Sequence, residues 1–327
     1  MYDDNTAAVS YHKRGIQRWR SELFTESFLS VPNATIVNAI KTDGVFCAPA
    51  ALTENFLSSI CEDVARTGHG LNRNWVSSVY TADQLFLCHM FAVSPSFIKY
   101  CTDSRFFELF DQILEGHYRL KCHRYYETYG GHHMPWHTDN KIEQGLGNTR
   151  GLIAIAYMSD VADGEFQYVR GSQIWSGERD YNYYTDQFVE QNYSNEILSF
   201  TGPKGTLVIF DTYGIHRAKP VKKSNFIRKS LHFQVDGALK ASEPLLINPE
   251  YIDNLDDRIK RYLGFGQPSG LNIYPDTDFS TMPLRQQGEI FRDFIRRLGK
   301  SARAPARLLP SQVKSAVKGF LRHTPIS

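Results

Sequence analysis

Apolar residues recur at helical spacing in three segments of the first third of the chain. These segments are residues 12–30, 53–66 and 104–116. A turn is expected after the first of them, at Pro32 and Asn33, and Thr53 and Ser104 are placed to cap the second and third helices. The pattern therefore predicts a helical N-terminal region over residues 1–116.

From residue 117 the pattern changes to short runs rich in β-forming residues, separated by Gly, Asp and Asn. The predicted strands are residues 118–130, 150–160, 164–172, 205–213 and 228–236. Strands of this length with such turns are typical of an antiparallel barrel or a jelly roll. Helical spacing returns at 249–263, 284–298 and 311–322. We expect one domain over 1–327, in which a β core (117–236) lies between the N-terminal helical region and a helical C-terminal extension (237–327).

Composition excludes several classes of protein. The 327 residues carry a formal net charge of +2, which gives no reason to expect a nucleic acid as partner. No uninterrupted apolar run is long enough to span a membrane, and the polar, acidic N-terminus does not resemble a secretory signal. The five cysteines form no C-x-x-C pair, so buried reduced thiols are expected rather than disulfides. A cytoplasmic location follows as the expectation.

The C-terminal segment 292–327 differs from the rest in charge. It holds nine Lys or Arg residues and one acid, Asp293. Such a segment can contact an anionic partner or membrane surface. A solvated helical tail is the alternative, because Pro305 and Pro310 interrupt the helical pattern.

The candidate chemistry begins with "HMPWHTDNK" (133–141). If this segment is extended, His137 and Asp139 point to the same side and can bind one metal ion, with Thr138 opposed. A third ligand must then come from elsewhere in the chain. Two histidines and one carboxylate on one face of an octahedron leave the opposite face open, which suits Fe(II). His132 and His133 are rim candidates only, because Pro135 interrupts the strand.

His216 is the candidate third ligand, since it follows the apolar strand in "GTLVIFDTYGIHRAKP" (205–220). Twelve positions later, Arg228 opens "RKSLHFQV", where its guanidinium can hold a carboxylate through two hydrogen bonds. Strand alternation places Arg228, Ser230 and His232 on one face of that strand. Arg217, directly after His216, is the rival cation.

Four blocks in this order resemble the Fe(II)/2-oxoglutarate-dependent dioxygenases, and the phytanoyl-CoA dioxygenase family in particular. The blocks are "IKTDGVFCAPAALTENFLSSI" (40–60), "MPWHTDN" (134–140), "LIAIAYMSDVADGEFQYVRGSQ" (152–173) and "GTLVIFDTYGIHRAKP" followed by Arg228. The resemblance covers roughly residues 38–236. Two positions depart from the family pattern: Gln173 stands where the family has the histidine of a GSH motif, and Ala218 stands where many members have a serine. The interval from His216 to Arg228 is also one residue longer than the commonest spacing.

The resemblance implies a double-stranded β-helix (jelly-roll, cupin-like) core that binds Fe(II), with 2-oxoglutarate as co-substrate and O2 as oxidant. It implies His137, Asp139 and His216 as metal ligands and catalytic centre, and Arg228, with Thr138, as contacts of 2-oxoglutarate. An aspartate at 139 favours oxygenation over halogenation. We therefore expect hydroxylation of a small-molecule or carrier-bound substrate. Desaturation, cyclisation, epimerisation or an inactive jelly-roll binding module are the alternatives.

Overall fold

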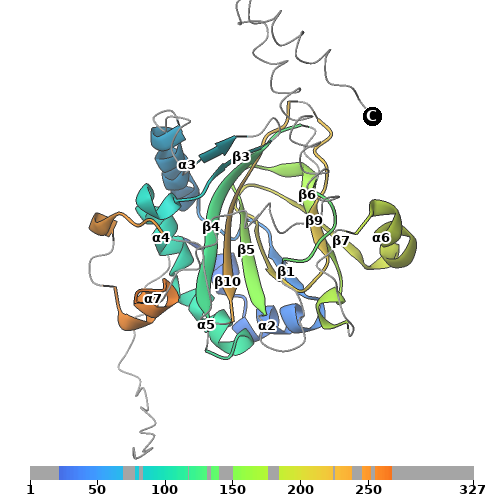
Figure 1. The fold of residues 1–327 in the computed structure, drawn as a ribbon, viewed down its shortest axis with the longest axis horizontal. Coiled ribbons are helices and arrows are strands. Elements are labelled where there is room, and N and C mark those ends of the chain that lie inside the picture. The colour runs from blue at the N-terminus through green and yellow to red at the C-terminus, as the bar shows by residue number, and fades with distance from the viewer. Residues whose placement is uncertain are drawn as a thin grey trace, which may run out of the picture.

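The computed structural model describes most of the central part of the chain (Figure 1). The described residues are 22–68, 78–80, 84–116, 118–130, 134–139, 150–175, 184–223, 225–237, 245–251 and 255–266. The predicted helices at 284–298 and 311–322, the basic segment 292–327, residues 12–21 of the first predicted helix, and His132 and His133 lie outside these ranges.

Two antiparallel sheets face each other and form the jelly-roll core. The larger has the strand order β1-β8-β5-β10-β4-β3-β2 and the smaller has the order β7-β6-β9, and neither closes into a barrel. The strands of the larger sheet are β1 (Val45–Ala48), β2 (Ser78–Tyr80), β3 (Gln84–Leu87), β4 (Arg119–Thr128), β5 (Gly151–Tyr157), β8 (Leu207–Asp211) and β10 (Arg228–Asp236). Those of the smaller are β6 (Val161–Val169), β7 (Ile197–Gly202) and β9 (His216–Ala218).

Alternation along the strands divides the buried side chains between two cores. In β5, Ile153 and Ile155 pack between the two sheets, whereas Leu152 and Ala154 join the core on the helical face. Every residue of β5 is consequently buried, which explains why its sequence is continuously apolar. The same alternation in β10 turns Arg228 and the residues at every second position after it toward the smaller sheet.

Helices cover the outer face of the larger sheet (Figure 1). The helices are α1 (Glu26–Leu29), α2 (Asn33–Thr42), α3 (Glu54–Gly68), α4 (Pro95–Cys101), α5 (Ser104–Ile113), α6 (Asp186–Tyr193) and α7 (Asp257–Tyr262). Figure 1 shows α3, α4, α5 and α7 on that side, and α6 beyond the smaller sheet. Short 3-10 turns lie at Met90–Ala92, Ser172–Ile174, Ser194–Glu196 and Pro249–Tyr251. No described helix has the length and apolar character needed to span a bilayer.

One of the two predicted helix-capping residues is confirmed. Thr53 caps α3 as expected, because its hydroxyl accepts a hydrogen bond from Phe56 N at 3.3 Å. Asp103 rather than Ser104 caps α5, since its carboxylate accepts from Arg105 N at 2.8 Å. A carboxylate adds a favourable charge at the helix N-terminus, which a hydroxyl cannot supply.

Several elements differ from the sequence-based expectation. The described part of the first predicted helix contains only the single turn α1, and the next helix, α2, begins at Asn33 where a turn was expected. The strands β1, β2 and β3 belong to the region that was predicted to be helical. Such short strands carry too few residues for a clear alternating pattern, and pairing within the sheet determines their conformation.

Candidate metal centre

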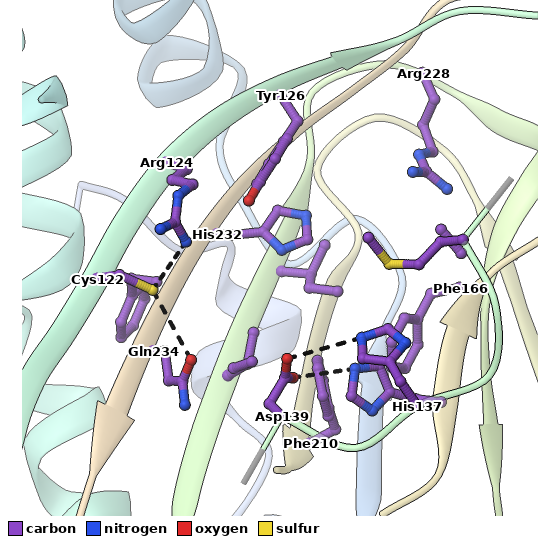
Figure 2. A pocket seen from close by; sticks show the side chains of 16 residues that line it. Cys122, Arg124, Tyr126, His137, Asp139, Phe166, Phe210, Arg228, His232 and Gln234 are labelled. Atoms are coloured by element: carbon purple, nitrogen blue, oxygen red, sulfur yellow. Dashed lines mark hydrogen bonds and ion pairs between the residues drawn. The ribbon is translucent and has the colours of Figure 1, made fainter. Parts of the chain in front are cut away.

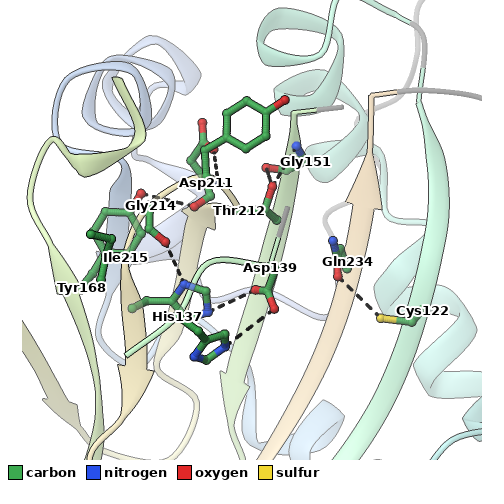
Figure 3. Close-up of polar contacts among 12 residues, drawn as sticks. Cys122, His137, Asp139, Gly151, Tyr168, Asp211, Thr212, Gly214, Ile215 and Gln234 are labelled. Atoms are coloured by element: carbon green, nitrogen blue, oxygen red, sulfur yellow. Dashed lines mark hydrogen bonds and ion pairs between the residues drawn. The ribbon is translucent and has the colours of Figure 1, made fainter. Parts of the chain in front are cut away.

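A backbone bridge joins the two histidines that the sequence singled out. His137 and His216 donate to and accept from each other through their backbone N–H and C=O groups, both at 2.9 Å. Asp139 N donates to Thr212 O at 3.1 Å, which fixes the same segment two residues later. The loop carrying His137 and Asp139 therefore runs beside β9, the strand that begins at His216, and Figure 3 shows the side chains of His137 and Asp139 close to each other.

The three side chains converge on one point. Their ligand atoms all lie within 4.8 Å of one another. Asp139 Oδ2 is 3.1 Å from His216 Nε2, and Asp139 Oδ1 is 3.8 Å from His137 Nε2. Among the described residues this is the group of His, Cys, Asp and Glu side chains that can hold a metal ion.

Hydrogen bonds at Nδ1 of each imidazole determine which ring nitrogen can bind a metal. His137 Nδ1 lies 2.8 Å from Pro135 O, and His216 Nδ1 lies 3.0 Å from Gly214 O. A carbonyl oxygen can only accept, so each Nδ1 donates a proton and each Nε2 keeps its lone pair. Histidine ligands are commonly oriented in this way.

The donor set fits a cation. The buried Asp139 Oδ2 accepts no hydrogen bond from the described residues, although it faces His216 Nε2. The lone pairs of Asp139 Oδ2 and His216 Nε2 repel each other at this distance unless a cation lies between the two atoms. Burial lowers the pKa of His137 to about 4, and nearby His216 adds to this effect. Burial alone would raise the pKa of Asp139, but the imidazoles of His216 and His137 hold it well below its usual range. These shifts favour the neutral form of His137 and the carboxylate form of Asp139, which are the forms that bind a metal.

Arg228 is a buried cation in the same pocket. Its side chain is nearly inaccessible, and its guanidinium donates to Gly164 O and, at 3.3 Å, to Thr128 Oγ1. Burial lowers its pKa, which expresses the cost of removing this charge from water. Its hydrogen bonds to Gly164 O and Thr128 Oγ1 reach neutral groups, while Glu165, which pairs with Lys219 at 2.8 Å, acts on Arg228 through its charge. A carboxylate brought by a ligand would add a charged hydrogen-bond partner.

Arg217, the rival cation, faces the other way. Its guanidinium lies 4.3 Å from the ring centroid of Trp136, and it donates to Gln167 Oε1 at 2.8 Å and Asp186 Oδ1 at 2.5 Å. It is not among the described residues that line the pocket. Arg217 instead ties the two ligand-bearing segments together from behind, because it follows His216 and stacks on the residue before His137.

The pocket beside the three ligands encloses about 680 Å³ of empty space, which includes open solvent at its mouth. Figure 2 shows His137 and Asp139 at one side of it and Arg228 at another. Apolar side chains form part of the lining, and the three converging side chains and polar residues of β4 and β10 form the rest. The lining residues are Cys122, Arg124, Tyr126, Met134, His137, Asp139, Ile153, Ile155, Phe166, Phe210, His216, Ala218, Arg228, His232, Phe233 and Gln234.

The phytanoyl-CoA dioxygenase family model matches residues 40–230, more than half of the chain. The chain belongs to this family. The protein is thus an iron- and 2-oxoglutarate-dependent oxygenase, which confirms the class and the cofactors indicated by the four sequence blocks. No curated protein matches the chain significantly.

Solved structures of HygX from Streptomyces hygroscopicus share the fold. HygX with nickel and 2-oxoglutarate bound gives a TM-score of 0.52 at 15% identity, over 65% of this chain and 89% of HygX. HygX with nickel, 2-oxoglutarate and hygromycin B bound gives a TM-score of 0.50 at 15% identity, over 64% and 88% of the two chains. At this identity the likeness concerns the fold alone.

The two positions that depart from the phytanoyl-CoA dioxygenase pattern lie in different places. Gln173 is buried and donates to Lys41 O at 3.2 Å and Thr42 O at 3.3 Å, so it holds the end of α2. Ala218 lines the pocket beside its strand partner Phe166. Thr138 is buried but is not among the described lining residues, and its contact with 2-oxoglutarate stays a prediction.

Three polar residues of the dioxygenase pocket were not singled out as site residues from the sequence. Arg124 comes from β4, and His232 and Gln234 come from β10. The signal that would have found them is alternation, because each lies an even number of positions from an inward-facing neighbour on its strand. Tyr126 of β4 also lines the pocket, whereas Trp136 packs in a separate core beneath Arg217.

Proposed function

We propose that this dioxygenase hydroxylates an aliphatic C–H bond of a small-molecule or carrier-bound metabolite and converts 2-oxoglutarate and O2 to succinate and CO2. One oxygen atom of O2 enters the C–H bond and the other enters succinate, so the reaction balances. The observation that carries the proposal is the convergence of His137, Asp139 and His216 at the wall of a pocket that also contains Arg228.

In this proposal the three converging side chains hold the iron through two Nε2 atoms and one carboxylate. Bound iron and 2-oxoglutarate supply the oxidising chemistry. The residues of the chain orient the reactants, and the backbone bridge between His137 and His216 keeps two ligands at a fixed separation. The buried position of His216 and the apolar lining exclude water from one side of the site.

Arg228 is proposed to bind the distal carboxylate of 2-oxoglutarate. Its guanidinium is held by Gly164 O and Thr128 Oγ1, so the remaining N–H groups are oriented before the ligand arrives. Preorganised donors lose little freedom on binding, which strengthens a charge-assisted hydrogen bond. The pocket position of Arg228, and the engagement of Arg217 with Trp136, support this choice between the two cations.

Hydroxylation is favoured by Asp139, because a carboxylate leaves no ligand position vacant for halide. The likeness to HygX, whose structure holds hygromycin B, supports a small-molecule substrate. Desaturation, cyclisation and epimerisation would use the same residues, and the mass of the product distinguishes them. Hydroxylation adds one oxygen atom, desaturation or cyclisation removes two hydrogen atoms, and epimerisation leaves the mass unchanged.

The proposal is tested by incubating the protein with Fe(II), ascorbate, O2 and 2-oxoglutarate and measuring succinate. We expect slow succinate formation without a primary substrate, and faster formation when a candidate substrate gains one oxygen atom. Asp139→Ala should abolish both. Asp257→Ala, which removes a carboxylate that is 88% exposed on α7, is the matched control and should retain both. Succinate formation unaffected by Asp139→Ala would contradict the ligand assignment, and none with the unaltered protein would favour the inactive binding module.

Two further expectations from the sequence stay predictions: the cytoplasmic location, and contact of the basic segment 292–327 with an anionic partner or membrane surface. Deletion of residues 300–327 tests the second. Unchanged kinetics on the true substrate and unchanged binding to anionic vesicles would remove it.

A further inference from the structure

The strands β4 and β10 present four facing pairs of side chains toward the smaller sheet. In the register of the two strands, Arg228 faces Thr128, Ser230 faces Tyr126, His232 faces Arg124, and Gln234 faces Cys122. The two arginines therefore lie on neighbouring strands of one sheet, at different positions along the strand direction. Both line the pocket, and so does His232 between them.

The separation of these two cations is too large for one carboxylate to bridge. Arg124 stands at the level of His232, four residues from Arg228, which corresponds to roughly 13 Å along a strand. Figure 2 shows Arg124 and Arg228 on opposite sides of His232. A 2-oxoglutarate held between the metal ligands and Arg228 therefore leaves Arg124 facing the remaining part of the pocket. This step rests on the proposed function.

The charges of the lining residues indicate what the remaining part accepts. Among the described lining residues the cations are Arg124 and Arg228, and the acid is Asp139. Burial lowers the pKa of His232 to about 3, so this imidazole is neutral and adds no charge. With Asp139 directed at the metal and Arg228 at 2-oxoglutarate, Arg124 is the remaining charged residue among the described residues of the lining.

Arg124 has polar neighbours, and apolar residues lie elsewhere in the lining of the same pocket. Its Nη1 donates to Cys122 Sγ at 3.2 Å, and sulfur is a weaker acceptor than a carboxylate or phosphate oxygen. Figure 2 shows the Tyr126 hydroxyl on the same side of His232 as this guanidinium. Ile153 and Phe210 line the pocket from β5 and β8 and offer contact to an aliphatic chain.

We infer that Arg124, assisted by the hydroxyl of Tyr126, forms a second anion subsite that binds a carboxylate or phosphate group of the primary substrate. The subsite holds the charged end of the substrate and directs its aliphatic part along Ile153 and Phe210 toward the metal ligands. The substrate class is then a small, partly aliphatic anion. Arg124 determines specificity and takes no part in holding the metal or 2-oxoglutarate.

Calorimetric titration of the full chain loaded with Ni(II) and 2-oxoglutarate tests this inference. The probes are hexanoate, hexyl phosphate and hexan-1-ol, which share a chain and differ in charge. We expect at least one anion to bind on the order of tenfold more tightly than the alcohol, and the better anion identifies the group. Arg124→Met should remove this preference, and Tyr126→Phe should reduce it. Arg170→Met, which alters a half-exposed arginine on another face, should retain it.

Three results would overturn the inference: equal binding of anions and alcohol, absence of anion binding, or an anion preference that survives Arg124→Met. Loss of 2-oxoglutarate affinity in Arg124→Met would assign this residue to the co-substrate and also overturn it. Arg124→Lys, which keeps the charge, should retain part of the preference and controls for misfolding. If the unaltered chain binds neither Ni(II) nor 2-oxoglutarate, the proposed function fails, and the same titration of the apoprotein still decides whether Arg124 binds anions.

Discussion

His137 and His216 are joined by two backbone hydrogen bonds of 2.9 Å, although the two residues lie 79 positions apart in the chain. This bridge sets the distance between two proposed ligands before any metal binds. Their ring centroids are 4.4 Å apart, and each Nδ1 is held by a carbonyl oxygen two residues earlier. Changes that move either backbone should therefore weaken metal binding without altering a ligand.

Gly214 provides one such change. A Cβ atom at this position would lie 1.7 Å from Tyr168 Oη, while Gly214 O accepts the hydrogen bond from His216 Nδ1 (Figure 3). Because Tyr168 is fully buried, Gly214→Ala should displace the turn, destabilise the fold by about 1–3 kcal/mol and weaken Ni(II) binding at least tenfold. Calorimetry and urea unfolding measure both. Gly116→Ala, where a Cβ meets open space at positive φ, should lower stability alone; equal Ni(II) affinities in the two variants would contradict the argument.

Arg217 supports the backbone bridge between His137 and His216, because it follows His216 and stacks on Trp136. Its removal by Arg217→Met abolishes the stacking on Trp136 and the charge-assisted bonds to Asp186 and Gln167. We expect a loss of about 2 kcal/mol in the free energy of unfolding, together with a severalfold weaker affinity of the folded protein for Ni(II). Arg217→Lys keeps the charge but not the planar stack, so its effects should be intermediate. Unaltered metal affinity in both variants would limit Arg217 to a role in stability.

Removal of Arg228 should weaken the binding of 2-oxoglutarate and leave the binding of the metal ion unchanged. Arg228→Met removes the guanidinium and leaves Thr128 Oγ1 and Gly164 O without this donor. Affinity for 2-oxoglutarate, measured by calorimetry on the Ni(II)-loaded protein, should fall by on the order of a hundredfold, because a buried charge-assisted pair is lost. Ni(II) affinity should change little. Arg170→Met is the matched control, and 2-oxoglutarate binding that resists Arg228→Met would return the choice to another cation.

His123 makes stability depend on pH. It is buried and stacks on Phe91 with ring centroids 4.0 Å apart, and burial lowers its pKa to about 3. The unfolded chain takes up a proton as the pH falls through about 6.5, whereas folded His123 stays neutral, so stability is lost between pH 6.5 and about 3. His123→Phe should reduce the stability difference between pH 7 and pH 5 by about 1–2 kcal/mol in urea unfolding. The same pH dependence in both proteins would contradict this.

The sequence predicted those features that depend on local pattern. Strand β10 was placed at its observed bounds, with Arg228 and His232 on one face, because a two-residue period specifies orientation directly. His137, Asp139 and His216 could be grouped because each follows a recognisable strand or turn. The resemblance to a known family then linked segments that pattern alone leaves separate.

The features that the sequence left open depend on contacts between distant segments. Arg124 enters the pocket because β4 pairs with β10. The sequence around residue 124 does not indicate that β10 is the strand beside it. The choice between Arg217 and Arg228 required the position of Trp136, which comes from another part of the chain. In the same way, Asp103 rather than Ser104 caps α5, because Asp103 has the extended backbone of a capping residue and Ser104 is already helical.

The central claim is that His137, Asp139 and His216 hold iron together with 2-oxoglutarate. Its most direct test is the visible absorption spectrum of the anaerobic apoprotein after addition of Fe(II) and then 2-oxoglutarate. The account predicts a weak metal-to-ligand charge-transfer band that requires both additions, is absent in Asp139→Ala and is retained in Asp257→Ala. Absence of the band in the unaltered protein, with no 2-oxoglutarate binding by calorimetry, or its persistence in Asp139→Ala, would contradict the account.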